Sequence, residues 1–392
     1  MTLVFPDGLR FDCGSCTRCC RGTWSVPLDP QAWRRISTSD LFARLTEEDG
    51  AAPAYLEDPE AGECSARTRL KGADCAFLAP DGKCLVHKEL GASAKPFGCS
   101  QFPFLVRPTP DGVYVGVSFY CSAVQANHGR PLSEHVGDLE RAVASHHFPR
   151  IGSRVALDPQ RDIAWEVYRD LEASAESTLA GTPGLREGLW LAALRIVLLS
   201  SLLGRQGGEA GERWQQVRGV NIPYDEIFAS LEDIFLVGIV GAIESRDPAE
   251  CRANCEAFVR RGHVVTESFG AIDLTHFDDF RGRFDPAWSE AEMRRFVEHL
   301  LFRKFLPYKR NLAANAAAWY LTVPLLSLYR DLSAFSAGRL QPDITDLRRG
   351  FEIVERSFTL HVNLLDPLFE ELASGYRRML DAMPELTAGG PP

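Results

Sequence analysis

An eight-residue motif near the N-terminus, Cys13-Gly-Ser-Cys16-Thr-Arg-Cys19-Cys20, constrains the fold of this chain more than any other feature. Buried cysteine packs as a small hydrophobe, but packing does not require repeats of two intervening residues. Metal ligation does favour this interval, because a C-x-x-C loop turns two thiolates onto one ion and a third cysteine extends the chelate. The motif therefore predicts a metal or iron–sulfur centre.

The adjacent pair Cys19-Cys20 indicates how many centres there are. In an extended backbone, neighbouring side chains point to opposite faces, so two such thiolates seldom reach one ion without an unusual turn. We therefore expect Cys19 and Cys20 to serve different centres or to flank one polynuclear cluster. Two four-coordinate centres with sulfur ligands need eight thiolates. The predicted metal ligands are Cys13, Cys16, Cys19, Cys20, Cys75, Cys84, Cys99 and Cys121.

Other cysteines and one histidine are weaker candidates. The role of Cys64 stays open between a ligand and a buried thiol. Cys251 and Cys255 stand four residues apart on a predicted helix, a spacing that could present two ligands but is more typical of a buried apolar face. His87 follows Cys84 by three residues and is either a further ligand or a polar strand-end residue. An all-thiolate site suits zinc or an iron–sulfur cluster, and the sequence does not decide between them.

Length, charge and composition describe a soluble globular protein. The 392 residues suggest two domains at roughly 100–200 residues each, and 45% apolar with 24% charged residues are ordinary values. A net charge of −10 disfavours a nucleic-acid partner. The N-terminus shows no secretory signal, so we expect a cytoplasmic protein with reduced thiols, which favours metal over disulfides. The apolar stretches 189–203 and 312–329 are predicted to be buried helices, and no membrane span is expected.

The pattern along the chain predicts an α+β protein with two domains. Residues 1–150 form a loop-rich cysteine-cluster domain with little regular core and short strands at 76–78, 84–87 and 113–119. Asp81-Gly82 is predicted to be the turn joining the first two strands. Residues 151–385 form an α-helical domain, and 386–392 a frayed tail. Its predicted helices span 163–179, 185–203, 224–244, 250–261, 289–305, 312–335, 344–360 and 367–383.

The cysteine motif resembles the signature of the YkgJ-type cysteine-cluster proteins, which are described as zinc- or iron-chelating. The wider layout, over about residues 11–125, is more similar to the flagellin lysine-N-methylase branch. The segments that carry this similarity are Trp24 to Asp29, Cys75-Ala-Phe77-Leu78, Asp81-Gly82, Cys84, Lys88-Glu89-Leu90-Gly91, Cys99, Phe102-Pro103 and Cys121. Farther along, only 299–306 is loosely similar.

The resemblance implies a cluster-binding domain and methylation of lysine in a protein partner such as flagellin, with S-adenosylmethionine as the methyl donor. The sequence itself has no strand–GxGxxG–helix unit and no C-x-x-x-C-x-x-C spacing of common radical enzymes that cleave this donor. Gly238 and Gly241 lie inside a predicted helix, where they would permit close helix packing. No catalytic or donor-binding residues are predicted, so the cluster would have to help hold the donor.

Two alternatives to an enzyme stay open. In the first, the chain is a module that chelates zinc or iron or carries electrons, and its helical domain docks a partner. In the second, zinc stabilises the fold of the loop-rich domain and the function lies in the helices. A local run of cations could bind an acidic partner or a carboxylate-bearing cofactor, or form a solvated helix face. It comprises Arg294, Arg295, Arg303, Lys304, Lys309 and Arg310.

Overall fold

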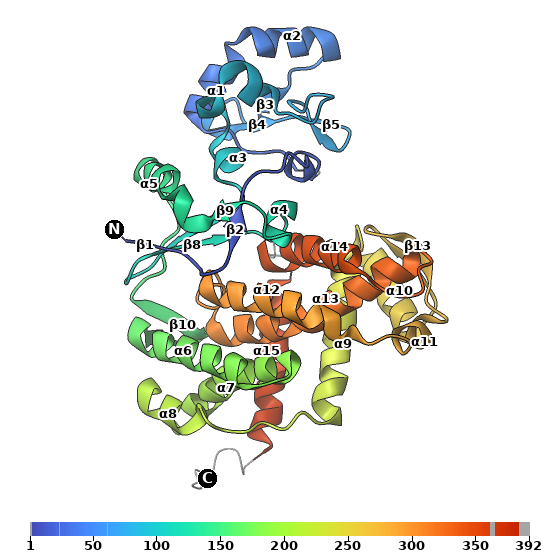
Figure 1. Cartoon of the computed structure of the whole chain (residues 1–392). Helices are drawn as coiled ribbons and strands as arrows, with labels where there is room; N and C mark the ends of the chain where they lie inside the picture. Colours follow the sequence, from blue (N-terminus) through green and yellow to red (C-terminus); the bar gives the residue numbers. More distant parts are fainter. Residues whose placement is uncertain (1, 23, 61, 361–364, 384–392) are drawn as a thin grey trace. The chain divides into compact units, whose positions relative to one another are not determined.

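The computed structural model describes residues 2–22, 24–60, 62–360 and 365–383, and the chain divides into two compact units. The helical unit consists of Met1–Val4, Val106–Gly116 and Phe148–Pro392, and the cysteine-rich unit of Phe5–Leu105 and Val117–His147. Figure 1 shows their elements. The predicted α+β class is confirmed. The domain boundaries at 150 and 385 stay predictions, and the tail 386–392 lies outside the described residues.

The helical unit is built around α13, which is mainly apolar and is buried along most of its length. This helix spans Leu312–Ser336, and Asn311 caps it by accepting a hydrogen bond from the N–H of Ala314 at 2.9 Å. It packs against α7 (Leu185–Gln206), α14 (Ile344–Val354) and α15 (Asp366–Asp381). A helix that is mainly apolar all round is stable in water only when neighbours cover it, so α13 forms the centre of the core.

The remaining helices of this unit follow the apolar periodicity of the sequence, and the eight predicted helices are confirmed. The others are α6 (Trp165–Gly181), α9 (Glu226–Ile243), α10 (Pro248–Arg260) and α12 (Glu290–Phe302). The segment predicted to run to 360 continues α14 as the π-helical turn η7 (Glu355–Leu360). Short elements absent from the prediction are α8 (Ala210–Val217), α11 (Phe277–Arg281), η6 (Pro286–Ser289), and the hairpins β10 (Arg154–Asp158) with β11 (Arg161–Ala164) and β12 (His263–Thr266) with β13 (Gly270–Asp273).

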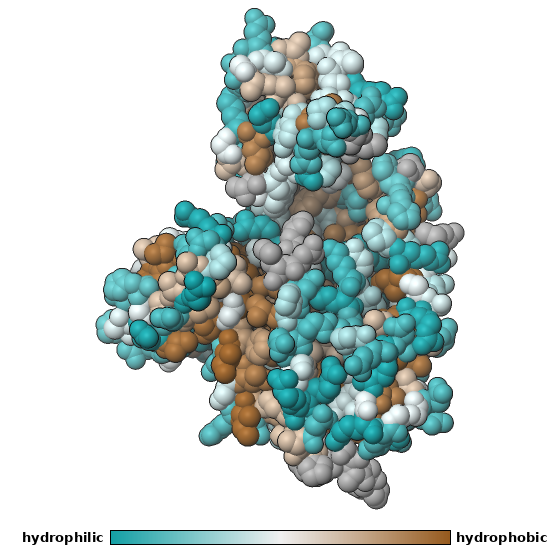
Figure 2. Space-filling view, turned by 180° about the vertical axis from the view of Figure 1, so that it is seen from behind, coloured by the Kyte–Doolittle hydropathy of each residue, from teal (hydrophilic) through white to brown (hydrophobic). Residues whose placement is uncertain are grey.

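The helices α7 and α13 are long and apolar enough to cross a membrane by length and composition alone. Within the most apolar window of each, 78% and 83% of the residues are buried. The core helices of soluble proteins pass the same test, so the finding is weak evidence for a span. Figure 2 shows polar residues over much of one face of the helical unit, broken by scattered apolar patches.

The α12 helix ends in a Schellman turn, and two cations at this turn, Arg303 and Lys304, are buried in the core. The N–H of Lys304 donates to the carbonyl of Leu301, and the N–H of Phe305 donates to that of Leu300, both at 3.0 Å. Lys304 therefore occupies the left-handed position, with φ 62°, where glycine is usual. Its buried ammonium lies 2.6 Å from the carboxylate of Glu172, which compensates for the burial of the charge.

The cysteine-rich unit has short elements and a small apolar core. Its strands are β2 (Arg10–Phe11) paired with β9 (Arg130–Pro131), β3 (Ala54–Leu56) with β4 (Ala66–Thr68), and β5 (Leu70–Lys71) with β6 (Asp74–Cys75). Its helices and helical turns are η1 (Arg18–Cys20), α1 (Pro30–Ser37), α2 (Asp40–Asp49), η2 (Gly62–Ser65), η3 (Val86–Leu90), η4 (Ala92–Ala94), α3 (Phe97–Gln101), α4 (Ser122–Gln125), η5 (Leu132–His135) and α5 (Val136–Ser145). A three-stranded sheet has the order β1 (Leu3–Val4), β8 (Val113–Val117) and β7 (Phe104–Pro108), and most of its residues belong to the helical unit.

Two sequence predictions for this region need correction. Ten buried residues, among them Ile36, Leu41 and Phe77, form a hydrophobic core under α1 and α2, so the unit does have a core of its own. The predicted strands 76–78 and 84–87 are absent, because Val86 begins a helical turn and only a single bridge joins Leu78 to Cys84. The turn between them and the strand beginning at residue 113 are confirmed.

Candidate functional site

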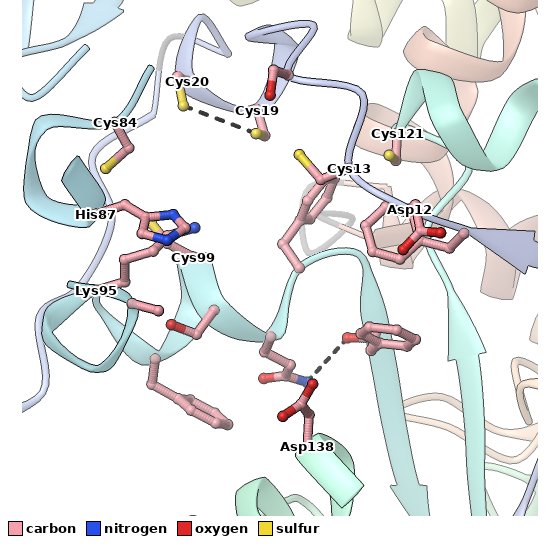
Figure 3. A pocket seen from close by; sticks show the side chains of 18 of the residues that line it. Asp12, Cys13, Cys19, Cys20, Cys84, His87, Lys95, Cys99, Cys121 and Asp138 are labelled. Carbon is pink, nitrogen blue, oxygen red and sulfur yellow. Dashed lines mark hydrogen bonds between the residues drawn. The ribbon is translucent and has the colours of Figure 1, made fainter. Parts of the chain in front are cut away.

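A pocket of about 1210 Å³ in the cysteine-rich unit collects most of the predicted ligands. Seven of the eight line it, and Cys75 does not. Figure 3 shows the labelled cysteines around one open space, with Cys20 and Cys84 on one side and Cys121 on the other. Segments more than a hundred residues apart in the sequence thus contribute thiols to a single cavity. The seven lining cysteines are Cys13, Cys16, Cys19, Cys20, Cys84, Cys99 and Cys121.

The cysteine motif makes an unusual turn. Thr17 has a left-handed backbone, φ 64°, and the next three residues form the 3-10 turn η1, closed by the N–H of Cys20 on the carbonyl of Thr17 at 2.8 Å. The premise of an extended backbone is therefore wrong. The Sγ atoms of Cys19 and Cys20 lie 4.0 Å apart, close to the roughly 3.8 Å between two sulfurs on one tetrahedral zinc. Assignment of these two thiols to different centres stays a prediction.

Asp29 holds the segment that carries Cys99. One of its carboxylate oxygens caps α1 by accepting from the N–H of Ala32 at 2.9 Å, and the other accepts from the N–H of Phe97 at 3.2 Å. Phe97 begins α3, and Cys99 follows two residues later. A single carboxylate therefore fixes the starts of two helices and the position of a cavity-lining thiol.

The thiol of Cys121 lies at the N-terminus of α4, where the structure also brings Cys16. Cys121 is the N-cap residue of this short helix and is buried. The hydroxyl of the next residue, Ser122, donates to the Sγ of Cys16 at 2.9 Å. This contact joins the cysteine motif to a segment more than a hundred residues away.

The electrostatics of the thiols divide them into two overlapping groups. Burial is the largest cause that raises the pKa of Cys99 to about 12, followed by the nearby thiols of Cys75, Cys84 and Cys19. Burial likewise raises the pKa of Cys121 to about 11, with Cys16 and Cys19 as its thiol neighbours. Because Cys19 belongs to both sets, one thiol connects the two groups.

Lys95 is a cation of this cavity whose effect on the thiols was not predicted, and it favours their thiolate forms. A hydrogen bond with Cys20 and then burial raise the pKa of Cys19, and the charge of Lys95 acts in the opposite direction. Lys95 has the same effect on Cys99. Figure 3 shows it beside Cys99 and His87. His87 does line the cavity, and its role as a ligand stays a prediction.

The wall of the cavity carries an excess of positive charge in an acidic chain. Six lysines and arginines line it against three aspartates, although the whole chain has a net charge of −10. A cluster of metal-bound thiolates carries net negative charge, and cations around it offset that charge. The cations are Arg18, Lys83, Lys88, Lys95, Arg130 and Arg141, and the carboxylates are Asp12, Asp29 and Asp138.

A buried histidine that sequence reasoning missed forms another wall. Nε2 of His135 lies 2.9 Å from the carbonyl oxygen of Phe11, so this nitrogen carries the proton. Nδ1 is then the acceptor facing Arg130 at 3.4 Å, and Arg130 donates through Nε to Asp12 at 3.1 Å. These partners are far apart in the sequence, and no local motif predicts their meeting.

The thiols surround the cavity without converging on one point. Among the residues that the structure describes, no group of three or more His, Cys, Asp or Glu side chains is close enough to hold a metal ion. The donor chemistry and the surrounding charge fit a metal–thiolate centre, and the Sγ atoms of Cys19 and Cys20 lie at the separation of two ligands on one metal. Metal ligation by the eight cysteines therefore stays a prediction.

The other cysteines lie elsewhere. The side chain of Cys64 is outside the described residues. Cys251 and Cys255 lie on α10 against Gly241 of α9, where an added Cβ would stand 2.4 Å from the Sγ of Cys255. The prediction that Gly241 permits close helix packing is confirmed. It is wrong for Gly238, since nothing lies within 4 Å of a Cβ at that position.

Comparison with known proteins gives one partial similarity. A protein named Lysine-N-methylase, from Salmonella typhimurium, is 30% identical over 119 residues, which are 29% of this chain and 29% of that protein. The chain thus matches less than a third of the length of this relative. No family model matches the chain, and no solved structure matches it. Membership in the YkgJ-type family therefore stays a prediction.

Proposed function

We propose that the cysteine-rich unit binds an iron–sulfur or zinc centre through Cys13, Cys16, Cys19, Cys20, Cys75, Cys84, Cys99 and Cys121. The observation that carries this proposal is the cavity itself, which seven of these thiols line and whose wall carries an excess of positive charge. Burial raises the pKa of these thiols, so a bound metal would have to displace their protons. The nearby cations would offset part of the negative charge of the resulting thiolates.

We propose further that the whole chain is a protein-lysine N-methyltransferase that uses S-adenosylmethionine in the cytoplasm. The name of the Salmonella relative supports lysine as the acceptor, and the partial match supports a protein substrate. Flagellin, implied by the sequence resemblance, is the first substrate to test. When bound, the centre would supply a site beside which the methyl donor is held.

Several residues of this chain would organise that site. Asp29 would keep Cys99 in place through α3, and Lys95 would stabilise the thiolates of Cys19 and Cys99. The cavity, at about 1210 Å³, exceeds the roughly 300–1,000 Å³ of typical ligand pockets. It therefore has room for a small molecule beside a metal centre.

Calorimetry with S-adenosylmethionine tests the enzymatic part of the proposal. The full chain, purified without oxygen and loaded with its metal, should bind the donor and transfer labelled methyl groups to flagellin. The double variant Cys19→Ser/Cys20→Ser should lose metal and donor binding together, whereas Cys251→Ser, outside the cavity, should retain both. A metal-replete protein that binds no donor would leave the chelating or electron-carrying module as the better description.

A further inference from the structure

The basic run 294–310 in the helical unit resolves into paired and unpaired cations. Five of its six predicted cations bind a carboxylate, which explains them as structural or solvated ion pairs. The pairs are Arg294 with Glu290, Arg295 with Glu292, Arg303 with Glu355, Lys304 with Glu172, and Arg310 with Asp366. Lys309 alone of this run makes no ion pair with any residue that the structure describes.

Arg107, near Lys309, is a second cation that makes no ion pair with any residue that the structure describes. The guanidinium carbon of Arg107 stacks 3.7 Å from the centroid of the Tyr308 ring, and the Nζ of Lys309 lies 5.5 Å from the same centroid. Arg107 donates one hydrogen bond, from Nη1 to the carbonyl of Val106 at 3.1 Å, and no described carboxylate pairs with it. A guanidinium has five N–H donors, so most of its edge has no protein acceptor in the described chain.

Positive neighbours destabilise the charge of both cations. Burial is the largest cause that lowers the pKa of Arg107, and the charge of Arg303 adds to it. The pKa of Lys309 is lowered by burial first and then by Arg107 and Arg310, while Asp366 opposes this effect. A negative group near Arg107 and Lys309 would favour the charged form of both side chains.

The loop that carries Lys309 is held rigidly. The buried side-chain amide of Asn315 donates to the carbonyls of Leu306 and Tyr308 at 2.7 and 3.0 Å, with longer contacts to two more carbonyls. Lys309 itself has a left-handed backbone, φ 68°, which side-chain-bearing residues adopt at a cost. Such a loop positions the aromatic ring and the ammonium in advance of any ligand.

We propose that Arg107, Tyr308 and Lys309 form an anion site for a small ligand bearing a carboxylate or a phosphate group. A guanidinium stacked on an aromatic ring presents its N–H edge as a planar fork, which matches two oxygens of such a group. Lys309 supplies a second, more exposed charge. The proposal is independent of the metal centre and of methyl transfer.

Isothermal titration of the full chain with inorganic phosphate and, separately, with glutarate tests this site, at an ionic strength held constant with chloride. We expect saturable binding of at least one of the two, weakened about tenfold by Lys309→Gln. Arg107→Gln should weaken it as much or more. Arg260→Gln, which removes an equally positive but exposed side chain of α10, should leave it unchanged.

Each outcome decides the proposal. Binding of phosphate alone assigns the site to phosphate groups, binding of glutarate alone assigns it to carboxylates, and binding of both supports their shared chemistry. Binding of neither overturns the proposal. Equal binding by the parent chain and Lys309→Gln overturns it as well, and that variant changes an exposed side chain, so its folding is not in doubt.

Discussion

Replacement of Lys304 by methionine removes a cation from the core of the helical unit while keeping the length of the side chain. The ammonium lies 2.6 Å from the carboxylate of Glu172 and 3.7 Å from the centroid of the Tyr114 ring. Both charged groups are 1% exposed. Burial raises the pKa of Glu172 and lowers that of Lys304, so each charge depends on the other for compensation.

The expected cost follows from the groups left behind. Removing one partner of a buried ion pair typically costs about 3–5 kcal/mol, because the other charge stays buried without compensation. Glu172 would keep hydrogen bonds from Tyr168 and Arg169. We therefore expect Lys304→Met to lower the free energy of unfolding by about 3 kcal/mol, the lower end of that range. This corresponds to a fall of about 6–12 °C in melting temperature for a unit of this size.

Chemical denaturation monitored by circular dichroism measures this loss, and a double variant tests its cause. The double variant Lys304→Met/Glu172→Gln removes both charges of the pair. The loss in free energy of unfolding should therefore shrink to about 1 kcal/mol. Lys71→Met, which breaks an exposed pair with Asp49, should cost less than about 1 kcal/mol. The reasoning fails if the single variant costs under about 1 kcal/mol, or if the double variant is as unstable as the single one.

Three further predictions concern packing, capping and pH. Gly241→Ala should lower the free energy of unfolding by about 1–3 kcal/mol, because the added methyl group would clash with Cys255. In the same denaturation assay, Gly238→Ala should raise it by up to about 1 kcal/mol. Equal effects of the two variants would refute the packing argument. Asp29→Ala should cost about 1–2 kcal/mol and weaken metal binding, and Asp29→Asn should retain the cap at α1; unchanged metal affinity in Asp29→Ala would contradict its positioning role. Burial raises the pKa of Glu244, so its contribution to stability is full below its unfolded pKa of about 4.3 and is lost as pH rises through its higher folded pKa. Glu244→Gln should thus lose more melting temperature relative to the parent at pH 4 than at pH 7, and a pH-independent difference would refute this.

The sequence predicted the helical unit well because its helices carry their own signals. Apolar residues at helical spacing mark α7 and α13, and Asp247 before Pro248 marks the start of α10. The small hairpins escaped prediction because four-residue strands leave too short a pattern. Their stability comes from tertiary contacts that local sequence does not encode.

The candidate site was predictable in composition and not in geometry. Spacing of the cysteines identified the thiols that line the cavity, but the turn that brings Cys19 to Cys20 depends on the left-handed backbone at Thr17, a residue without that preference. Lys95 and His135 had no signal, because each acts on partners distant in the sequence. A local motif can thus identify the candidate ligands, but it does not predict which charged side chains surround them.

Metal and acid-labile sulfide analysis, together with an absorption spectrum of the anaerobically purified chain, determines whether the cysteine-rich unit binds a metal centre. We expect stoichiometric metal, either iron in a brown protein that absorbs near about 400 nm or zinc in a colourless protein. The metal should be lost in Cys19→Ser/Cys20→Ser and kept in Cys251→Ser. A parent chain that contains neither iron nor zinc, and takes up neither on reconstitution, would show that these cysteines do not form a metal centre.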